Sequence, residues 1–131
     1  MGSSILKSNA TGFTLIEIIA VLVILSTIAA LAIPKFIDLD ENAKGRAIEA
    51  GISELNGRES LIWADIKVSP TGWQDDATLF ATMDTDLGTA NYVWIVGPTA
   101  AGGRLSFQSG SPVDLIRTPS TSIGPAKWSR M

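Results

Sequence analysis

The chain carries a long uninterrupted run of apolar positions near its start, and the pattern changes abruptly after that run. Residues 13–33 read FTLIEIIAVLVILSTIAALAI, and Glu17 is the only charged member. As a helix the run spans roughly 30 Å, which matches the hydrocarbon core of a bilayer. A core helix of a soluble protein rarely stays apolar on all faces over this length. The run therefore predicts a membrane-spanning helix.

Beyond Pro34 the pattern becomes that of an amphipathic helix. Apolar residues recur at mostly three-, four- or seven-residue spacings with charged residues between them, which predicts a single apolar stripe. The stripe consists of Ile37, Ile48, Ile52, Leu55, Ile62 and Ile66. One helix from Phe13 to about Lys67, kinked at Pro34, would be roughly 80 Å long. Such a helix exceeds the diameter of a globule of this chain length and must find partners.

Three glycines interrupt this second part of the helix. Gly45, Gly51 and Gly57 each weaken a helix by up to ~1 kcal/mol relative to Ala. They equally allow another element to pack closely against the helix, and the pattern leaves both interpretations open.

The C-terminal half has the shorter periods of strands and turns. Ser69-Pro70-Thr71-Gly72 ends the helix. A short helical turn is predicted around Leu79–Met83, and three strands are predicted at Tyr92–Val96, Arg104–Gln108 and Val113–Arg117. The turns between them favour an antiparallel meander whose apolar face lies on the helix stripe, so the fold class is α+β. Residues 118–131 are expected to form an irregular tail.

The composition excludes most common kinds of catalytic site. The chain has no His and no Cys, which excludes Ser-His-Asp triads, Cys nucleophiles, zinc sites of the Cys/His kind and disulfides. The net charge of -3 lacks the basic excess of nucleic-acid-binding proteins, so a nucleic-acid partner is not expected. We predict no enzymatic activity and no cofactor.

The segment before the apolar run carries the most specific motif. A small polar leader, residues 1–12, contains Lys7 and ends in Gly12-Phe13-Thr14-Leu15-Ile16-Glu17. This motif, the apolar run and Pro34 at its end together resemble the type IV pilin-like proteins. The resemblance implies that a prepilin peptidase cuts between Gly12 and Phe13 and methylates the new amine of Phe13. It implies a leader over 1–12, a transmembrane and assembly helix over 13–33, and a periplasmic or extracellular domain over 34–131.

Glu17 is an acid inside the apolar run, and the free-energy cost of placing its carboxylate in a membrane needs an explanation. A carboxylate at the centre of a membrane helix costs about 2.5–3.5 kcal/mol, and less near an end. The helix dipole favours negative charge in the first turns. Cleavage would add an ammonium on Phe13 about 6 Å away along the axis. In the resembled family this amine pairs with the glutamate, so cleavage would supply a partner for Glu17. Pro34 is either a site where the helix unwinds in filaments or a simple kink at the membrane surface.

The resemblance implies a structural subunit of a type IV pilus-like filament that serves adhesion, motility or DNA uptake. The expected partners are further copies of the chain in a helical filament, prepilin peptidase, an inner-membrane assembly platform and a motor ATPase. The chain would be a single-pass inner-membrane protein before assembly and would then lie at the cell surface. The run Ile33-Pro34-Lys35-Phe36-Ile37-Asp38-Leu39 is similar to the mannose-sensitive haemagglutinin branch. Without the Cys pair of many pilins, packing of Trp128 is one way to hold the C-terminal tail.

Two alternatives stay open. A pseudopilin of a type II secretion system would form a periplasmic piston, and a calcium ion at Asp84 and Asp86 would favour it, although their spacing lacks an EF-hand pattern. A secreted soluble binding protein would be cut after Ala30-Leu31-Ala32, which resembles a signal-peptidase site. A mature N-terminus at Phe13 or at Ile33 separates the alternatives.

Overall fold

The fold is α+β, as expected, and is seen in a computed structural model that describes residue 2 and residues 12–131. The rest of the leader, including Lys7, lies outside the described residues. The elements follow one another as α1 (Leu15–Val68), α2 (Asp76–Thr82), β1 (Tyr92–Thr99), β2 (Gly102–Phe107), β3 (Val113–Thr118) and β4 (Lys127–Arg130). The chain divides into two compact units, residues 1–38 and residues 39–131.

Helix α1 is close to the predicted helix and continues through Pro34. It ends where the sequence places its stop. The Ser69 amide and hydroxyl both donate to the Ile66 carbonyl, at 3.2 and 2.6 Å, and these bonds satisfy carbonyl groups left without a helical partner. Gly72 follows with φ +66°, a conformation that glycine adopts without strain.

Helix α2 is short and begins with an aspartate cap. The Asp75 side chain accepts a hydrogen bond from the Thr78 amide at 2.7 Å, the usual arrangement at a helix N-cap. This bond lowers the pKa of the exposed Asp75 carboxyl. The sequence predicted a turn around 79–83, and the cap explains why the helix begins earlier, at Asp76.

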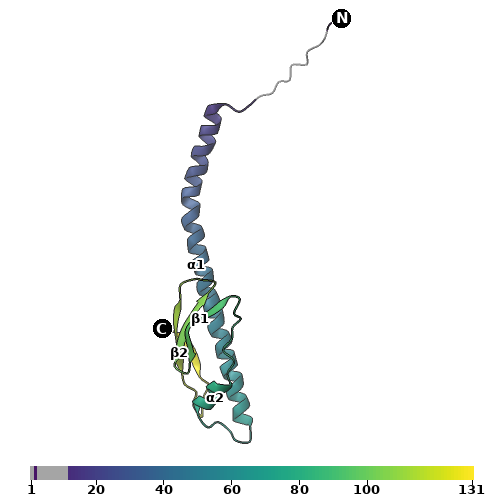
Figure 1. The fold of residues 1–131 in the computed structure, drawn as a ribbon, viewed down its shortest axis with the longest axis vertical. Coiled ribbons are helices and arrows are strands. Elements are labelled where there is room, and N and C mark those ends of the chain that lie inside the picture. Colours follow the sequence, from purple (N-terminus) through teal and green to yellow (C-terminus); the bar gives the residue numbers. More distant parts are fainter. Residues whose placement is uncertain (1, 3–11) are drawn as a thin grey trace. The chain divides into compact units, whose positions relative to one another are not determined.

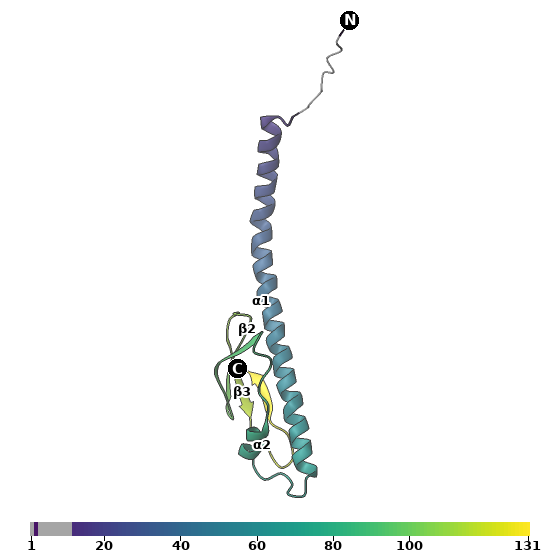
Figure 2. The ribbon, with the colours of Figure 1, turned by 45° about the vertical axis from the view of Figure 1, so that its right-hand side comes forward.

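The four strands form one antiparallel meander in the order β1-β2-β3-β4, and the sheet lies along the C-terminal half of α1 (Figures 1 and 2). The three predicted strands are present. The predicted irregular tail is wrong in one respect, because β4 pairs with β3 from Leu115↔Arg130 to Thr118↔Lys127. The sequence Lys-Trp-Ser-Arg is too short and polar to signal a strand, and pairing with β3 makes it one.

The core lies between the sheet and one stripe of α1. Ile48, Ile52 and Leu55 of α1 are buried against Leu105, Leu115 and Trp128 of the sheet. Two members of the predicted pattern differ: Ile37 is 60% exposed, and Glu59, expected among the solvated residues, is fully buried. Ile37 belongs to the first compact unit, residues 1–38, whereas the buried stripe of α1 belongs to the second.

The C-terminal tail is held by α1. Trp128 is buried in the core, which confirms its packing as an anchor. The Asn56 side-chain amide donates to the Trp128 carbonyl at 3.0 Å, and its oxygen accepts from the Trp128 amide at 2.7 Å. Asn56 thus satisfies the backbone groups of the edge strand β4 as a further strand would. Trp63 and Lys67 donate to the carbonyls of Thr121 and Ser122 and fix the loop that precedes β4.

The glycines of α1 differ in their surroundings. A Cβ at Gly51 would lie 3.0 Å from Tyr92 Cε1 and 3.3 Å from Leu87 Cδ1, whereas Gly57 has nothing within 4 Å. Close packing therefore explains Gly51 but not Gly57.

We predict that Gly57→Ala raises the free energy of unfolding by about 0.5–1 kcal/mol, because alanine restricts the unfolded chain and meets no neighbour. Gly51→Ala gains less than Gly57→Ala or destabilises, because Tyr92 must move. Urea unfolding of the full chain in detergent measures both variants. Equal gains at the two positions would show that the contact with Tyr92 is unimportant.

Candidate functional site

The predicted cleavage site lies in accessible backbone ahead of α1. Gly12 and Phe13 precede the helix, Phe13 is 85% exposed, and nothing lies within 4 Å of a Cβ built on Gly12. A protease needs an extended, reachable backbone, and this segment provides one. Because the leader is still attached, the nitrogen of Phe13 is an amide in this chain and carries no charge.

Thr14 and Glu17 form a reciprocal cap at the start of α1. The Thr14 amide donates to Glu17 Oε2 at 2.9 Å, and the Glu17 amide is within 3.3 Å of Thr14 Oγ1. This arrangement is a capping box, which satisfies two amides that the helix cannot pair internally. This cap was not among the predicted features, although Thr-x-x-Glu ahead of an apolar run is its signature. Glu17 therefore has a local role before any ammonium is present.

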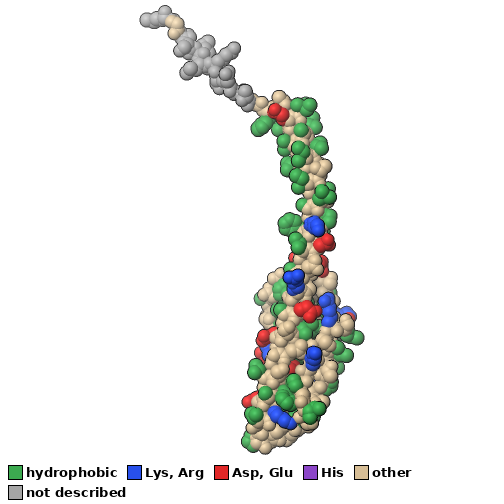
Figure 3. Space-filling view, turned by 180° about the vertical axis from the view of Figure 1, so that it is seen from behind, with side chains coloured by type: hydrophobic (Ala, Val, Ile, Leu, Met, Phe, Trp, Pro, Cys, Tyr) green, Lys and Arg blue, Asp and Glu red, His purple; other side chains and the backbone are tan. Residues whose placement is uncertain are grey.

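No residue of the apolar segment that follows is buried. Helix α1 contains a stretch of mean hydropathy 2.7, none of it buried, and green side chains dominate this part of Figure 3. Its hydroxyl groups need no outside partner: Ser26 donates to the Val23 carbonyl and Thr27 to the Ile24 carbonyl, both at 2.8 Å. Internal satisfaction of polar groups is what a bilayer requires of a spanning helix. By length and composition, the segment can cross a membrane.

A second group of ionisable residues lies inside the domain and was not foreseen. Arg117 of β3 is buried, and its guanidinium reaches Glu59 of α1 at 2.5 Å and Asp76 of α2 at 2.7 Å. Trp128 Nε1 donates to the same Glu59 carboxylate at 2.9 Å, and Ser120 donates to Asp76 through its amide and its hydroxyl. The cluster joins both helices, two strands and the C-terminal loop. The sequence gives no signal that residues 58 positions apart would pair.

The cluster is charged and fully hydrogen-bonded. Burial acts to raise the pKa of Asp76, but hydrogen bonds from Arg117 and Ser120 outweigh it and hold the pKa below the ordinary value. Burial also acts to lower the pKa of Arg117, and its bonds to Asp76 and Glu59 outweigh it and raise that pKa. No buried side-chain nitrogen or oxygen among the described residues lacks a hydrogen-bond partner. The polar atoms of the cluster therefore find their hydrogen-bond partners within the fold.

Asp84 and Asp86, the candidate calcium ligands, lie in a loop that Arg58 organises. Arg58 Nη1 donates to the backbone carbonyls of Asp84 and Asp86 at 3.0 and 2.8 Å. The two carboxylates accept from backbone amides two residues further on. Among the described residues, no group of three or more acidic side chains could hold a metal ion. A guanidinium thus fixes the loop through carbonyl oxygens of the kind that calcium uses.

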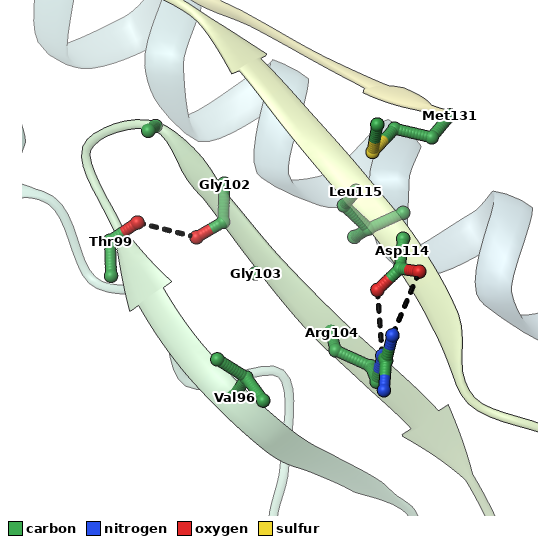
Figure 4. A pocket seen from close by; sticks show the side chains of 9 residues that line it. Val96, Thr99, Gly102, Gly103, Arg104, Asp114, Leu115 and Met131 are labelled. Carbon is green, nitrogen blue, oxygen red and sulfur yellow. Dashed lines mark hydrogen bonds and ion pairs between the residues drawn. The ribbon is translucent and has the colours of Figure 1, made fainter.

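The sheet carries a hollow of about 380 Å³ between the turn from β1 to β2 and strand β3, shown in Figure 4. Arg104 and Asp114 line it and form a two-pronged pair at 2.7 and 3.0 Å. Hydrogen bonding in this pair lowers the pKa of Asp114 and raises that of Arg104, and Thr99 donates to the Gly102 carbonyl. The two charged side chains that line the hollow, Arg104 and Asp114, therefore pair with each other.

Comparisons with known proteins agree with the N-terminal geometry. The Prokaryotic N-terminal methylation motif matches residues 7–33. The chain is 34% identical over 63 residues to the type IV narrow pilus major component PilA5 of Thermus thermophilus, a match that covers 48% of this chain and 54% of that protein. The chain thus spans about half the length of the curated relative it matches. No solved structure gives a significant match.

In its motif, its relative and its α+β fold, the chain is similar to the type IV pilin-like proteins. It combines a long N-terminal apolar helix with a small four-stranded antiparallel sheet.

We predict that Arg117→Ala lowers the free energy of unfolding by about 3–5 kcal/mol, because it leaves two carboxylates without their cation in the interior. Arg104→Ala is the matched control, since its pair with Asp114 is exposed to solvent and its loss should destabilise the domain far less. Chemical unfolding of the full chain in detergent measures both. Similar losses for the two variants would mean that the buried cluster does not hold the domain together.

Proposed function

We propose that the chain is a structural subunit of a type IV pilus-like filament, cut between Gly12 and Phe13 and methylated on Phe13. The observation that carries the proposal is an exposed apolar helix of bilayer length that begins at an accessible Gly-Phe bond and carries Glu17 in its first turn. Its leader, residues 1–12, would stay on the cytoplasmic side. The domain, residues 34–131, would lie outside the inner membrane.

The apolar surface supports an assembly function. Side chains such as Leu22, Ile24 and Ile28 are each more than half exposed, and each buried CH₂ group is worth about 0.8 kcal/mol. A bilayer covers residues 13–33 before assembly, and a bundle of copies of the same helix covers them in a filament. A motor ATPase and an assembly platform in the inner membrane would supply the work of moving the helix from one to the other.

The partners of Glu17 differ before and after cleavage. In the precursor, the Thr14 amide holds one carboxylate oxygen, and that bond survives cleavage because the Phe13–Thr14 peptide remains intact. Cleavage adds an ammonium on Phe13, next to the carboxylate that the cap already directs toward the helix start. The proposed pairing of Phe13 with Glu17, within one subunit or between two, then neutralises a charge that would be costly in a dry bundle.

A pseudopilin of type II secretion is the second candidate within the same class. Calcium at Asp84 and Asp86 would favour it, but in this structure the cation at that loop is Arg58. The relative that matches this chain is a pilus component by its name. The pilus is therefore the function that we propose, at the cell surface and with adhesion, motility or DNA uptake as its role.

Mass spectrometry of the N-terminus tests the processing. We expect the protein from filaments or membranes to begin at a methylated Phe13. A terminus at Ile33 would instead identify a secreted soluble protein, and a retained leader would contradict the proposal. Gly12→Leu should block processing and Gly12→Ala should slow it less, because a larger side chain obstructs close approach of the peptidase to the backbone.

A second prediction separates the charge of Glu17 from its cap. Glu17→Ala should leave membrane insertion intact and prevent incorporation into filaments, because the new ammonium loses its partner. Glu17→Gln keeps an oxygen for the Thr14 amide but lacks the charge, and it should fail in the same way. Membrane fractionation and filament yield measure the two steps. Wild-type yield from Glu17→Gln would mean that the cap, and not the ion pair, is what assembly needs.

A further inference from the structure

The sheet has an outer face, which points away from α1 (Figure 4, with the helix behind the sheet). Along β2 and β3, core residues such as Leu105 and Leu115 alternate with residues that point to this outer face. Apolar side chains remain exposed on it: Val96 is 57% exposed, Ile116 44% and Met131 84%. A sheet face with such residues is a surface that another molecule can cover.

The register of the strands places one residue of each strand in a row across the outer face. Val96 lies opposite Arg104, and Arg104 lies opposite Asp114. The Met131 amide donates to the Asp114 carbonyl, which places Met131 beside Asp114. In the order of the strands, the row is therefore apolar, basic, acidic and apolar. Turned end for end it is apolar, acidic, basic and apolar, so the row is complementary to itself.

The neighbouring row combines a hollow with a protruding side chain. Gly102 lies opposite Ile116 in the register, and together with Gly103 it lines the hollow of about 380 Å³. Gly102 has a φ of +137°, and a Cβ there would overlap the Leu115 carbonyl oxygen, so this position admits no side chain. The outer face is therefore recessed on β2 and raised by Ile116 on β3.

We propose that two copies of the chain pair through their outer faces, about a two-fold axis that runs between β2 and β3. This rotation places β3 of one copy over β2 of the other. Arg104 of each copy then meets Asp114 of the other copy, and Ile116 of each enters the hollow over Gly102 of the other. Apolar residues of β1 and β4 meet at the two edges. Two sheets with aligned strands pack about 10 Å apart in this way.

A second copy is the partner that this surface favours. The partner must present an acid opposite Arg104, a base opposite Asp114 and an apolar side chain opposite the hollow. An identical copy presents all three at the spacing of adjacent strands, without any other protein. The contact is isologous and closes after two copies. It therefore differs from the repeating contacts of the proposed filament and does not depend on them.

The size of the outer face indicates a weak pair. Four strands about 4.8 Å apart, with six residues of about 3.4 Å each in β2 and β3, give a face of roughly 400 Å². Stable interfaces bury about 800 Å² on each partner. Pairing therefore requires a high local concentration, which anchoring of the copies in one membrane would provide.

Cross-linking in membranes tests the pairing. Thr118 is exposed on the outer face of β3, and the two-fold axis places the Thr118 Cα atoms of two copies roughly 10–15 Å apart. Because the chain contains no cysteine, Thr118→Cys introduces a single thiol that a bifunctional maleimide joins to its counterpart. Copies with two different tags are expressed together in cells that lack pilus assembly proteins. We expect covalent dimers that carry both tags, and their absence would overturn the proposal.

An exchange of charges, made in the Thr118→Cys chain, tests which faces meet. The variant Arg104→Asp/Asp114→Arg keeps the ion pair within the chain, and it should pair with itself as the unexchanged chain does. A mixture of exchanged and unexchanged chains brings like charges together, so the yield of mixed dimers should fall several-fold. Mixed dimers as abundant as the two kinds of like dimer would overturn the proposal.

Matched controls make the same changes away from the outer face. Arg46→Asp/Asp65→Arg exchanges two exposed charges on α1, which packs on the opposite face of the sheet, and should leave mixed dimers at the unexchanged yield. Ile116→Ala should lower the dimer yield several-fold, whereas Ile123→Ala, in the loop before β4, should not. An equal loss from a control and from its outer-face counterpart would overturn the proposed contact.

Discussion

The constraint on which the rest of the structure depends is an apolar helix segment that the chain does not cover. Exposure of residues 13–33 is costly in water, because burial of apolar surface is worth about 25 cal/mol per Å². Within the part of the chain that the structure describes, the bilayer-length apolar window of α1 is 0% buried. Its stability must therefore come from lipid or from other molecules, whereas the sheet serves only the C-terminal half of α1. The proposed filament follows from that division of one helix into two environments.

The C-terminal residues of the domain are held by a buried polar cluster and not by a disulfide. Arg117, Glu59 and Asp76 join three elements of the fold, and hydrogen bonds from Trp128 and Ser120 add strand β4 and the C-terminal loop. Removal of one partner from a buried pair is far more costly than formation of the pair is favourable. The cluster therefore penalises partial opening, which is also what a covalent link achieves. Asn56 complements it by closing the free edge of β4.

The sequence predicted the long helix, three of the four strands and the N-terminal motif, because each of these has a local signal. A bilayer-length apolar run and β-branched stretches between turns such as Ser109-Gly110-Ser111-Pro112 can be recognised from a few adjacent residues. The missed features depend on distant partners. Glu59 looks like a solvated residue until β3 places Arg117 against it, and Lys127–Arg130 becomes a strand only beside β3. The capping box differs from these features, because its signature, Thr14-x-x-Glu17, is local and can be read from the sequence.

Two glutamates on α1 show how the same side chain is accommodated at the two ends of one helix. Glu59 is buried by its own chain, and folding delivers its cation, its indole donor and its surroundings together. Glu17 is exposed, and folding supplies only an amide from Thr14. An amide satisfies one oxygen but leaves the negative charge, so Glu17 is tolerable near the end of a membrane helix and costly inside a dry bundle. The missing cation is the one that peptide-bond cleavage would create. In the proposed function, cleavage of the Gly12–Phe13 bond supplies a cation for Glu17, whereas folding supplies Arg117 as the cation for Glu59.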